Sequence, residues 1–257
     1  MRRGTERLLQ AGLAVALLGA WQAGVSSGRI NPFFFPAPWD VLAQVGRWLR
    51  SATFYRHLGI TGAETVLGYL AGTGFGIVGG VALGLSRKTA RVLDPFIKAF
   101  NAVPRVVLAP IFVMWLGLGL WSKVALAATL VFYTTFFNAV QGVREVDPVV
   151  LANARLLGAR RGDLLWHVYL PAATSWILSS LRISVGFAVV GAIIGEYLGS
   201  SAGLGYVIAR AEGNFDVVGV FAGIALLAGF VLLIDALLDQ AEQRLLRWRP
   251  AAGGSGR

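Results

Sequence analysis

Four charged residues inside long apolar stretches of this sequence are candidates for function, because charge is costly there and usually marks function. They are Lys98, Arg105, Arg182 and Glu196. A guanidinium in apolar surroundings can offset the desolvation of a bound anion, and we expect this of Arg105 or Arg182. Lys98 can instead extend its charged end out of the apolar layer. A purely structural role is the alternative for each. Glu196 follows Arg182 by fourteen residues, about 21 Å of helix, which excludes a pair within one helix.

The residue inventory excludes several other chemistries. The chain contains no cysteine, so disulfides, thiolate metal sites and cysteine nucleophiles are excluded. Its two histidines are His57 and His167, and neither accompanies a nucleophile motif. The sequence contains no G-x-x-x-x-G-K-[ST], the loop that cradles ATP phosphates. We therefore expect no catalytic residue, no metal site and no cofactor bound by this chain.

The composition is typical of a membrane protein. Hydrophobic residues make up 56% of the chain and charged residues only 14%, against about 25% charged residues in soluble domains. A helix needs about 20 apolar residues to cross a membrane. Suitable runs occupy 8–25, 65–85, 92–116, 121–142, 173–198 and 217–238. The first run is long for a signal peptide, so we interpret it as a span. The prediction is an all-α polytopic fold with six transmembrane helices.

The basic residues predict the orientation of these spans. The net charge of +10 is also compatible with nucleic-acid binding, but the positive charges lie in short clusters between apolar runs. With the N-terminus in the cytoplasm, fourteen lysines and arginines lie inside and six outside. Cytoplasmic loops carry the excess of positive charge. We therefore predict both termini in the cytoplasm and no nucleic-acid partner.

Residues 26–64 are too polar to span a membrane. Residues 39–50 place apolar side chains on one face, which predicts a short helix lying in the membrane interface. Pro32, Pro36 and Pro38 prevent a helix directly before it. A solvated loop is the alternative. We divide the chain into residues 1–64, a core domain at 65–249 and a tail at 250–257.

Five glycines recur every four residues in the second span. They are Gly68, Gly72, Gly76, Gly80 and Gly84. Residues four apart share a helix face, and small residues there let a neighbouring backbone approach closely. We expect this span inside the bundle. The spacing leaves open whether the partner helix belongs to this chain or to a second copy.

The long cytoplasmic loop between the fourth and fifth spans, residues 142–171, predicts two short helices. Asp147 followed by Pro148 is a helix start, with an N-cap and then proline in the first turn. Gly158 can end that helix in a left-handed conformation. A second helix is expected at 163–169, before Pro171.

This loop resembles the signature of permease subunits of bacterial ABC importers. The family pattern is E-A-A, three residues, G, about nine residues, then a hydrophobic residue and L-P. The chain reads Ala152-Asn153-Ala154, Gly158-Ala159 and Val168-Tyr169-Leu170-Pro171. The family glutamate falls on Ala152, which puts a charged contact at that position in question. Four further stretches are similar to the nitrate, sulfonate, taurine and bicarbonate group: 101–110, 143–148, Gly195-Glu196 with 203–206, and 245–248.

The resemblance implies a type I ABC importer fold in which loop 143–171 is the coupling helix. The implied ATPase-coupling residues are Asp147, Pro148, Ala152, Ala154, Arg155, Gly158, Ala159 and Pro171. The candidate translocation residues are Asn101, Arg105, Arg182 and Glu196. The implied partners are an ATPase subunit that uses ATP and Mg, a periplasmic or lipid-anchored solute-binding protein, a second permease copy in a homodimer, and membrane lipids. The resemblance also implies a location in the inner membrane of a bacterial cell. The expected function is ATP-driven import of a small anion by alternating access.

Two other classes of membrane protein are alternatives. A secondary transporter or channel predicts ion-coupling carboxylates or broken helices in repeated halves. Glu196 is the one convincing acid inside a span, and the sequence shows no repeat. A membrane-embedded enzyme would need a nucleophile or metal motif, and neither occurs beside His57 or His167.

Overall fold

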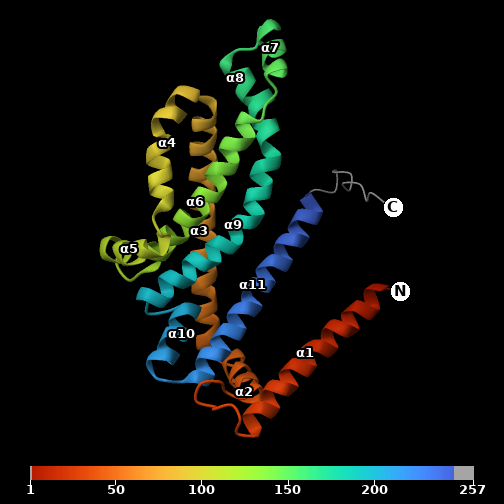
Figure 1. The fold of residues 1–257 in the computed structure, drawn as a ribbon. Coiled ribbons are helices and arrows are strands. Elements are labelled where there is room, and N and C mark those ends of the chain that lie inside the picture. The colour runs from red at the N-terminus through yellow and green to blue at the C-terminus, as the bar shows by residue number, and fades with distance from the viewer. Residues whose placement is uncertain (1, 246–257) are drawn as a thin grey trace.

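The computed structural model describes residues 2–245. The tail expected at 250–257 and nearly all of the stretch 245–248 lie outside the described residues. The described chain is built from helices joined by short turns (Figure 1). The helices are α1 (Arg2–Ser26), α2 (Pro38–Leu49), α3 (Ala52–Leu85), α4 (Arg87–Ala102), α5 (Leu108–Leu116), α6 (Leu120–Arg144), α7 (Pro148–Leu156), α8 (Arg161–Leu164), α9 (Leu170–Gly199), α10 (Leu204–Gly213) and α11 (Val217–Leu245).

The membrane-crossing segments agree with the predicted number. Within the described residues, five helical segments are long and apolar enough to cross a membrane, and a bent pair makes a sixth. The five are Leu8–Ser26, Ala52–Leu85, Leu120–Arg144, Arg161–Gly213 and Val217–Leu237. The sixth joins Arg87–Ala102 to Arg105–Leu116.

The second span begins earlier than the sequence predicts. Helix α3 starts at Ala52 and not at 65, so it runs through the boundary drawn between residues 64 and 65. His57, Thr61 and Glu64 made this stretch look too polar for a span. Thr61 and Glu64 are buried in the structure, and buried polar groups are tolerated where other buried groups satisfy them.

The third span is broken beside Arg105. The predicted run 92–116 is two helices that meet at 76°. Val103 and Pro104 are extended, and a single 3₁₀ turn, Arg105–Val107, leads into α5. Proline disfavours a helical conformation in the residue before it, so the helix ends at Ala102 and restarts in a new direction.

The glycine face of α3 packs against α6 of the same chain. A Cβ on Gly72 would stand 2.5 Å from the Ala128 carbonyl oxygen, and one on Gly80 would stand 2.5 Å from the Phe136 carbonyl oxygen. Gly68, Gly76 and Gly84 are equally close to α6. The partner left open by the sequence is therefore a helix of this chain.

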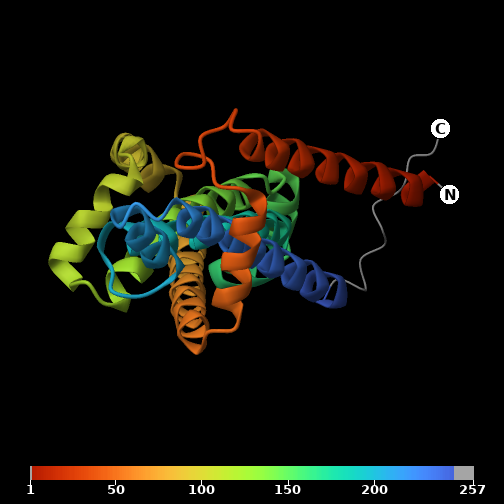
Figure 2. The same ribbon diagram turned by 90° about the horizontal axis from the view of Figure 1, so that it is seen from below.

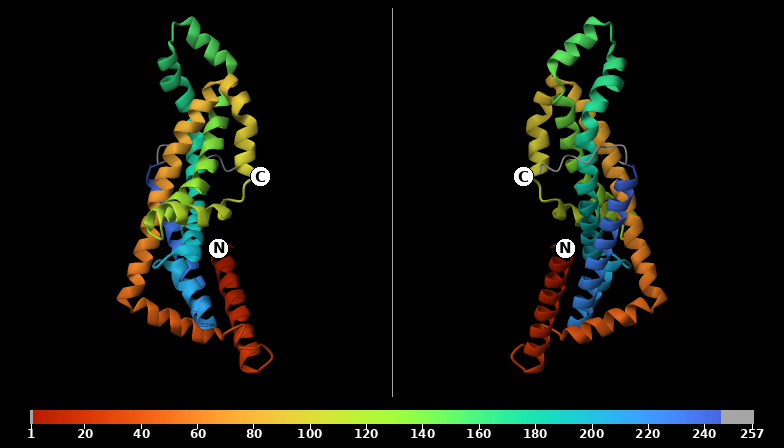
Figure 3. Two further views of the ribbon diagram at one scale, coloured as in Figure 1. Left: turned by 90° about the vertical axis from the view of Figure 1, so that its left-hand side faces the viewer. Right: turned by 90° about the vertical axis from the view of Figure 1, so that its right-hand side faces the viewer.

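Helix α9 completes the core by packing on α6 and α3 (Figures 1 and 3). A Cβ on Gly191 would stand 2.5 Å from the Ala127 Cα. Thr135 of α6 and Ser184 of α9 are fully buried, and their hydroxyl oxygens lie 3.2 Å apart. Three helices thus form one tightly packed unit whose backbones cannot separate without losing both packing and buried hydrogen bonds.

The remaining helices lie around this core. Helix α1 leans away from it and meets the rest of the chain near its C-terminal end, where the Trp21 and Phe221 rings are 5.9 Å apart (Figures 1 and 2). Helix α2 confirms the short helix expected at 39–50 and runs across one end of the bundle (Figure 3). Helices α7 and α8 lie at the opposite end (Figure 1).

Candidate coupling and translocation sites

Helix α7 has well-defined ends, as the sequence predicts. The Asp147 side chain accepts a hydrogen bond from the Val149 backbone N–H at 2.7 Å, and Pro148 occupies the first turn. At the other end, Ala159 N–H donates to the Ala154 carbonyl and Gly158 N–H donates to the Arg155 carbonyl, both at 3.0 Å. Gly158 has φ +86°. These two bonds form a Schellman motif, which requires a left-handed residue and therefore favours glycine.

The second helix of this segment differs from the prediction. Helix α8 covers Arg161–Leu164, and a π-helical turn, Leu165–Tyr169, then continues directly into α9. Pro171 therefore lies in the first turn of α9 and does not follow a separate helix at 163–169. Proline has no N–H for an intrahelical bond and its ring clashes with the preceding turn. A π turn at this point is one of the known ways to accommodate it.

Helix α7 and the residue after it expose large apolar side chains outside the membrane-crossing helices. Leu156 is 85% exposed and Leu157 is 88% exposed. Val149 and Val150 are also exposed. We call these four residues the α7 apolar surface. Exposed apolar residues grouped in this way are typical of a surface that binds another protein.

Arg105 lies at the break in the third span, beside the middle of α6. Its guanidinium carbon is 4.5 Å from the centre of the Tyr133 ring, a distance typical of a cation–π contact. Its Nη2 donates to the Asn101 side-chain oxygen. Its Nε is buried and has no hydrogen-bond partner among the described residues. The structure thus brings together the candidate translocation residues Asn101 and Arg105, and it leaves the buried Nε of Arg105 without a partner among the described residues.

The other two basic candidates lie apart from this cluster. Lys98 forms an ion pair with Asp94 at 2.6 Å, and its side chain is 74% exposed, in agreement with an end that extends out of the apolar layer. Arg182 lies on α9 with an exposed side chain. Their positions favour Arg105 as the charge that matters most inside the membrane.

Glu196 occupies a buried network that the sequence did not predict. The residue is 1% exposed. Its carboxylate accepts hydrogen bonds from the Thr61 hydroxyl and from the Gly205 N–H, both at 2.6 Å. Thr61 in turn accepts from the Leu204 N–H at 2.9 Å. A Cβ on Gly203 would overlap the Glu196 carboxyl group. Hydrogen bonds from the start of α10, within Gly203–Tyr206, therefore hold it against Thr61 of α3 and Glu196 of α9.

Lys123 and Glu64 belong to the same network. The sequence placed Lys123 among the outer charges, but the structure buries it completely in the first turn of α6. Its ammonium donates to the Leu118 and Gly119 carbonyls at 2.5 and 3.1 Å. Glu64 and Glu196 lie against each other, and Lys123 is close enough to interact electrostatically with both. The sequence offered one indication of this buried network, since Glu64 and Lys123 each lie at the edge of an apolar run.

The fold and these sites define a class of protein. The chain is an α-helical, multi-span membrane protein with a rigid three-helix core, a charged residue at a broken span, and an apolar surface exposed at one end. It belongs to the family described as "Binding-protein-dependent transport system inner membrane component", whose model matches residues 72–247.

Curated relatives agree with this assignment. The chain is 32% identical to the putative aliphatic sulfonates transport permease SsuC of Bacillus subtilis, over 94% of this chain and 88% of the relative. It is 33% identical to the taurine transport permease TauC of Escherichia coli, over 93% and 89%. It is 31% identical to the formylaminopyrimidine transport permease ThiX of Halalkalibacterium halodurans, over 97% and 99%.

A solved structure shares the fold. The chain superposes on a chain from the inward-facing MetNI methionine ABC transporter with a TM-score of 0.64, covering 76% of this chain and 95% of that one. The sequences are 18% identical. The likeness therefore concerns the architecture and says nothing of the solute.

Proposed function

We propose that this chain is the membrane-spanning permease subunit of an ATP-driven importer. The family assignment and the transport permeases among its relatives support this function. Because the sequence has no phosphate-binding loop, ATP and Mg belong to a separate ATPase subunit. A solute-binding protein delivers the solute, and the chain itself carries no catalytic residue or cofactor.

The α7 apolar surface is the observation that carries the proposal. It lies outside the membrane-crossing helices, and burial in a protein partner would stabilise it by about 25 cal/mol for each Å² of apolar area removed from water. Helix α7 lies between α6 and α9 in the chain, so a partner that moves α7 pulls directly on two of the three core helices. We propose that Asp147, Pro148, Gly158 and Ala159 hold the shape of this segment and that Ala152, Ala154 and Arg155 lie in the docking face. Pro171 fixes the start of α9.

The orientation and assembly follow from the same proposal. The end with α7 faces the cytoplasm, together with both termini, because the larger number of lysines and arginines lies on that side. The end with α2 and α10 then faces the binding protein. Two copies of the core at 65–249 line one pathway, as a homodimer surrounded by lipid, because a single six-span chain supplies half of it.

The solute is a small anion under this proposal. SsuC and TauC, as named, carry aliphatic sulfonates and taurine, whereas ThiX carries a formylaminopyrimidine. The Arg105 guanidinium lies beside Tyr133, near the middle of α6, and its Nε has no hydrogen-bond partner among the described residues. This position favours an anion such as nitrate, a sulfonate or bicarbonate. Asn101 lies beside Arg105 in the pathway, Arg182 lies farther along it on α9, and Glu196 holds the start of α10.

Docking of the ATPase can be tested on the α7 apolar surface. We expect Leu156→Glu combined with Leu157→Glu to reduce recovery of the ATPase subunit about tenfold or more in a pull-down of the permease, because two charges would be buried at the interface. Both side chains are almost fully exposed, so the permease itself folds normally.

The matched control is Phe215→Glu, which makes the same kind of change at an exposed apolar residue at the other end of the bundle. It leaves ATPase recovery unchanged. Undiminished recovery with the double α7 variant, or equal loss with the control, would show that α7 is not the docking site.

A further inference from the structure

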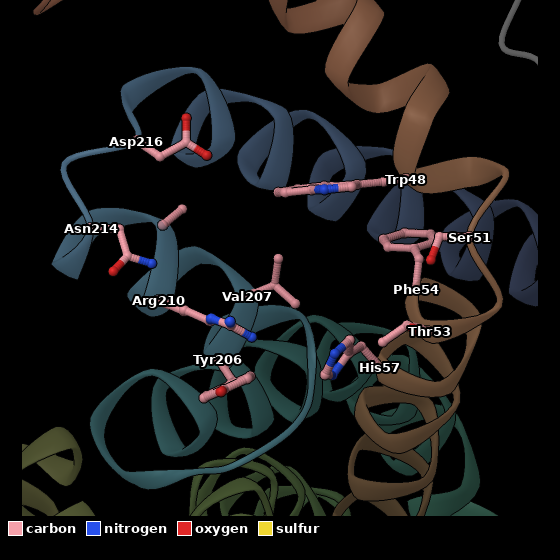
Figure 4. A pocket seen from close by; sticks show the side chains of 11 residues that line it. Trp48, Ser51, Thr53, Phe54, His57, Tyr206, Val207, Arg210, Asn214 and Asp216 are labelled. Carbon is pink, nitrogen blue, oxygen red and sulfur yellow. The ribbon is translucent and has the colours of Figure 1, made fainter.

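A cavity opens at the end of the bundle opposite α7, away from the Arg105 cluster. Its volume is about 270 Å³. Helices α2 and α3 form one wall, and α10 with the turn that follows it forms the other (Figure 4). It is separate from the break between α4 and α5, since none of its lining residues comes from those helices.

One side of this cavity is aromatic. Trp48 and Phe54 line it from the α2–α3 side, and Tyr206 lines it from α10 (Figure 4). The Tyr206 ring centre lies 5.8 Å from the ring centre of His57. Aromatic faces of this kind accommodate the flat or apolar part of a small ligand.

The polar groups of the cavity are mainly donors. The Arg210 side chain points into it toward His57 (Figure 4). Within the described part of the chain, the structure gives the Arg210 guanidinium no hydrogen bond or ion pair. His57 accepts the Gly203 N–H through Nδ1 at 3.0 Å, so the proton of its neutral ring is on Nε2, which is then a donor.

Asp216 is the one carboxylate among the described residues that line the cavity. One of its two oxygens accepts a hydrogen bond from the Gly219 N–H at 2.9 Å, at the start of α11. The cavity therefore combines an unpaired guanidinium, an imidazole donor and an apolar wall. Guanidinium groups bind carboxylates and similar oxyanions with two parallel hydrogen bonds.

We propose that this cavity is a binding site for a small organic anion with a flat apolar part. The anionic group binds Arg210 and the apolar part lies against Trp48 and Phe54. The site is distinct from the proposed pathway at Arg105 and does not depend on the transport function. A ligand held here would contact α3 and α10 together, next to the bonds by which His57 and Thr61 hold the beginning of α10.

The test uses the purified full-length chain without any partner, with benzoate as the probe and benzamide as its neutral analogue. Calorimetric titration is expected to show saturable binding of benzoate, and binding of benzamide at least about tenfold weaker, because the charged contact to Arg210 is lost. Arg210→Ala should weaken benzoate binding by a similar factor. Arg210→Gln, which keeps most of the side-chain length, should do the same and controls for a packing effect.

Two further variants make the result specific. Arg56→Ala removes an exposed arginine of α3 that does not line the cavity, and it should bind benzoate like the unmodified chain. Arg105→Ala removes the charge at the broken span and reveals whether benzoate binds in the proposed pathway and not in the cavity. The proposal is overturned if Arg210→Ala binds benzoate normally, if benzamide binds equally well, or if only Arg105→Ala loses binding. This titration does not test the transport proposal, since no ATPase or binding protein takes part in it.

Discussion

Replacement of Gly72 by leucine is expected to destabilise the three-helix core strongly. A side chain at this position would start 2.5 Å from the Ala128 carbonyl oxygen and 2.7 Å from the Val131 Cβ. Backbone atoms cannot rotate away as a flexible side chain can, so α3 and α6 would have to separate along their length. We expect a loss of about 3 kcal/mol in the free energy of unfolding, the upper end of the usual cost of overpacking. The measurement is the yield of monodisperse protein in detergent and its unfolding temperature.

Gly74→Leu is the matched control on the same helix. Gly74 is exposed, and a Cβ there would meet nothing within 4 Å. Leucine also favours helix over glycine by roughly 0.8 kcal/mol. The Gly74 variant should therefore be as stable as the unmodified chain or more so. If the two variants unfolded at the same temperature, the glycine face would not be what joins α3 to α6.

Arg105→Ala is expected to reduce solute uptake to background while the assembled complex is recovered normally. The variant removes the charge beside Tyr133 and the donor that has no partner among the described residues. An anion crossing the apolar layer would then lose the group that offsets its desolvation. Uptake of labelled solute by cells or vesicles measures the effect, and co-purification with the ATPase confirms assembly.

Two comparisons separate this role from a structural one. Arg105→Lys keeps the charge but loses the planar group that stacks on Tyr133, so an intermediate rate is expected. Lys98→Ala removes an exposed, paired charge of the same span and should leave uptake near normal. Normal uptake by Arg105→Ala would show that Arg105 is not part of the translocation pathway. Failure of that variant to assemble would indicate a structural role.

Some of this architecture could be predicted from residue spacing because local rules determine it. The Asp147–Pro148 start of α7, its end at Gly158, and the break beside Pro104 each depend on the conformational limits of a few adjacent residues. The four-residue repeat of glycines likewise predicts a close helix contact. Its partner could not be predicted, because the repeat says nothing of which helix faces it.

The network around Glu196 could not be predicted, because its members are far apart in the chain. Thr61 and Glu196 are 135 positions apart, yet one hydrogen bond of 2.6 Å joins them. From composition alone, residues 26–64 were expected to be too polar to span the membrane, and Lys123 was expected among the outer charges. Tertiary contacts bury these groups together, and this is why α3 is longer at its N-terminal end than hydropathy suggests.

The continuous path from α7 to the core suggests how a partner can act at a distance. Helix α6 leads into α7, and the π turn after α8 leads into α9 without interruption. Glycines bring α6 into close contact with α3 and with α9. We therefore expect a displacement of α7 to be transmitted to these three helices together, including Tyr133 beside Arg105.

The most direct test of the account is ATP-dependent uptake by the reconstituted assembly. The permease is placed in vesicles together with its ATPase subunit, with its binding protein and labelled solute on the outer side. We predict that the solute accumulates only when ATP and the binding protein are present, and that accumulation disappears in the Leu156→Glu, Leu157→Glu variant. Uptake that continues unchanged without ATP, or with that variant, would contradict ATP-driven import coupled through α7.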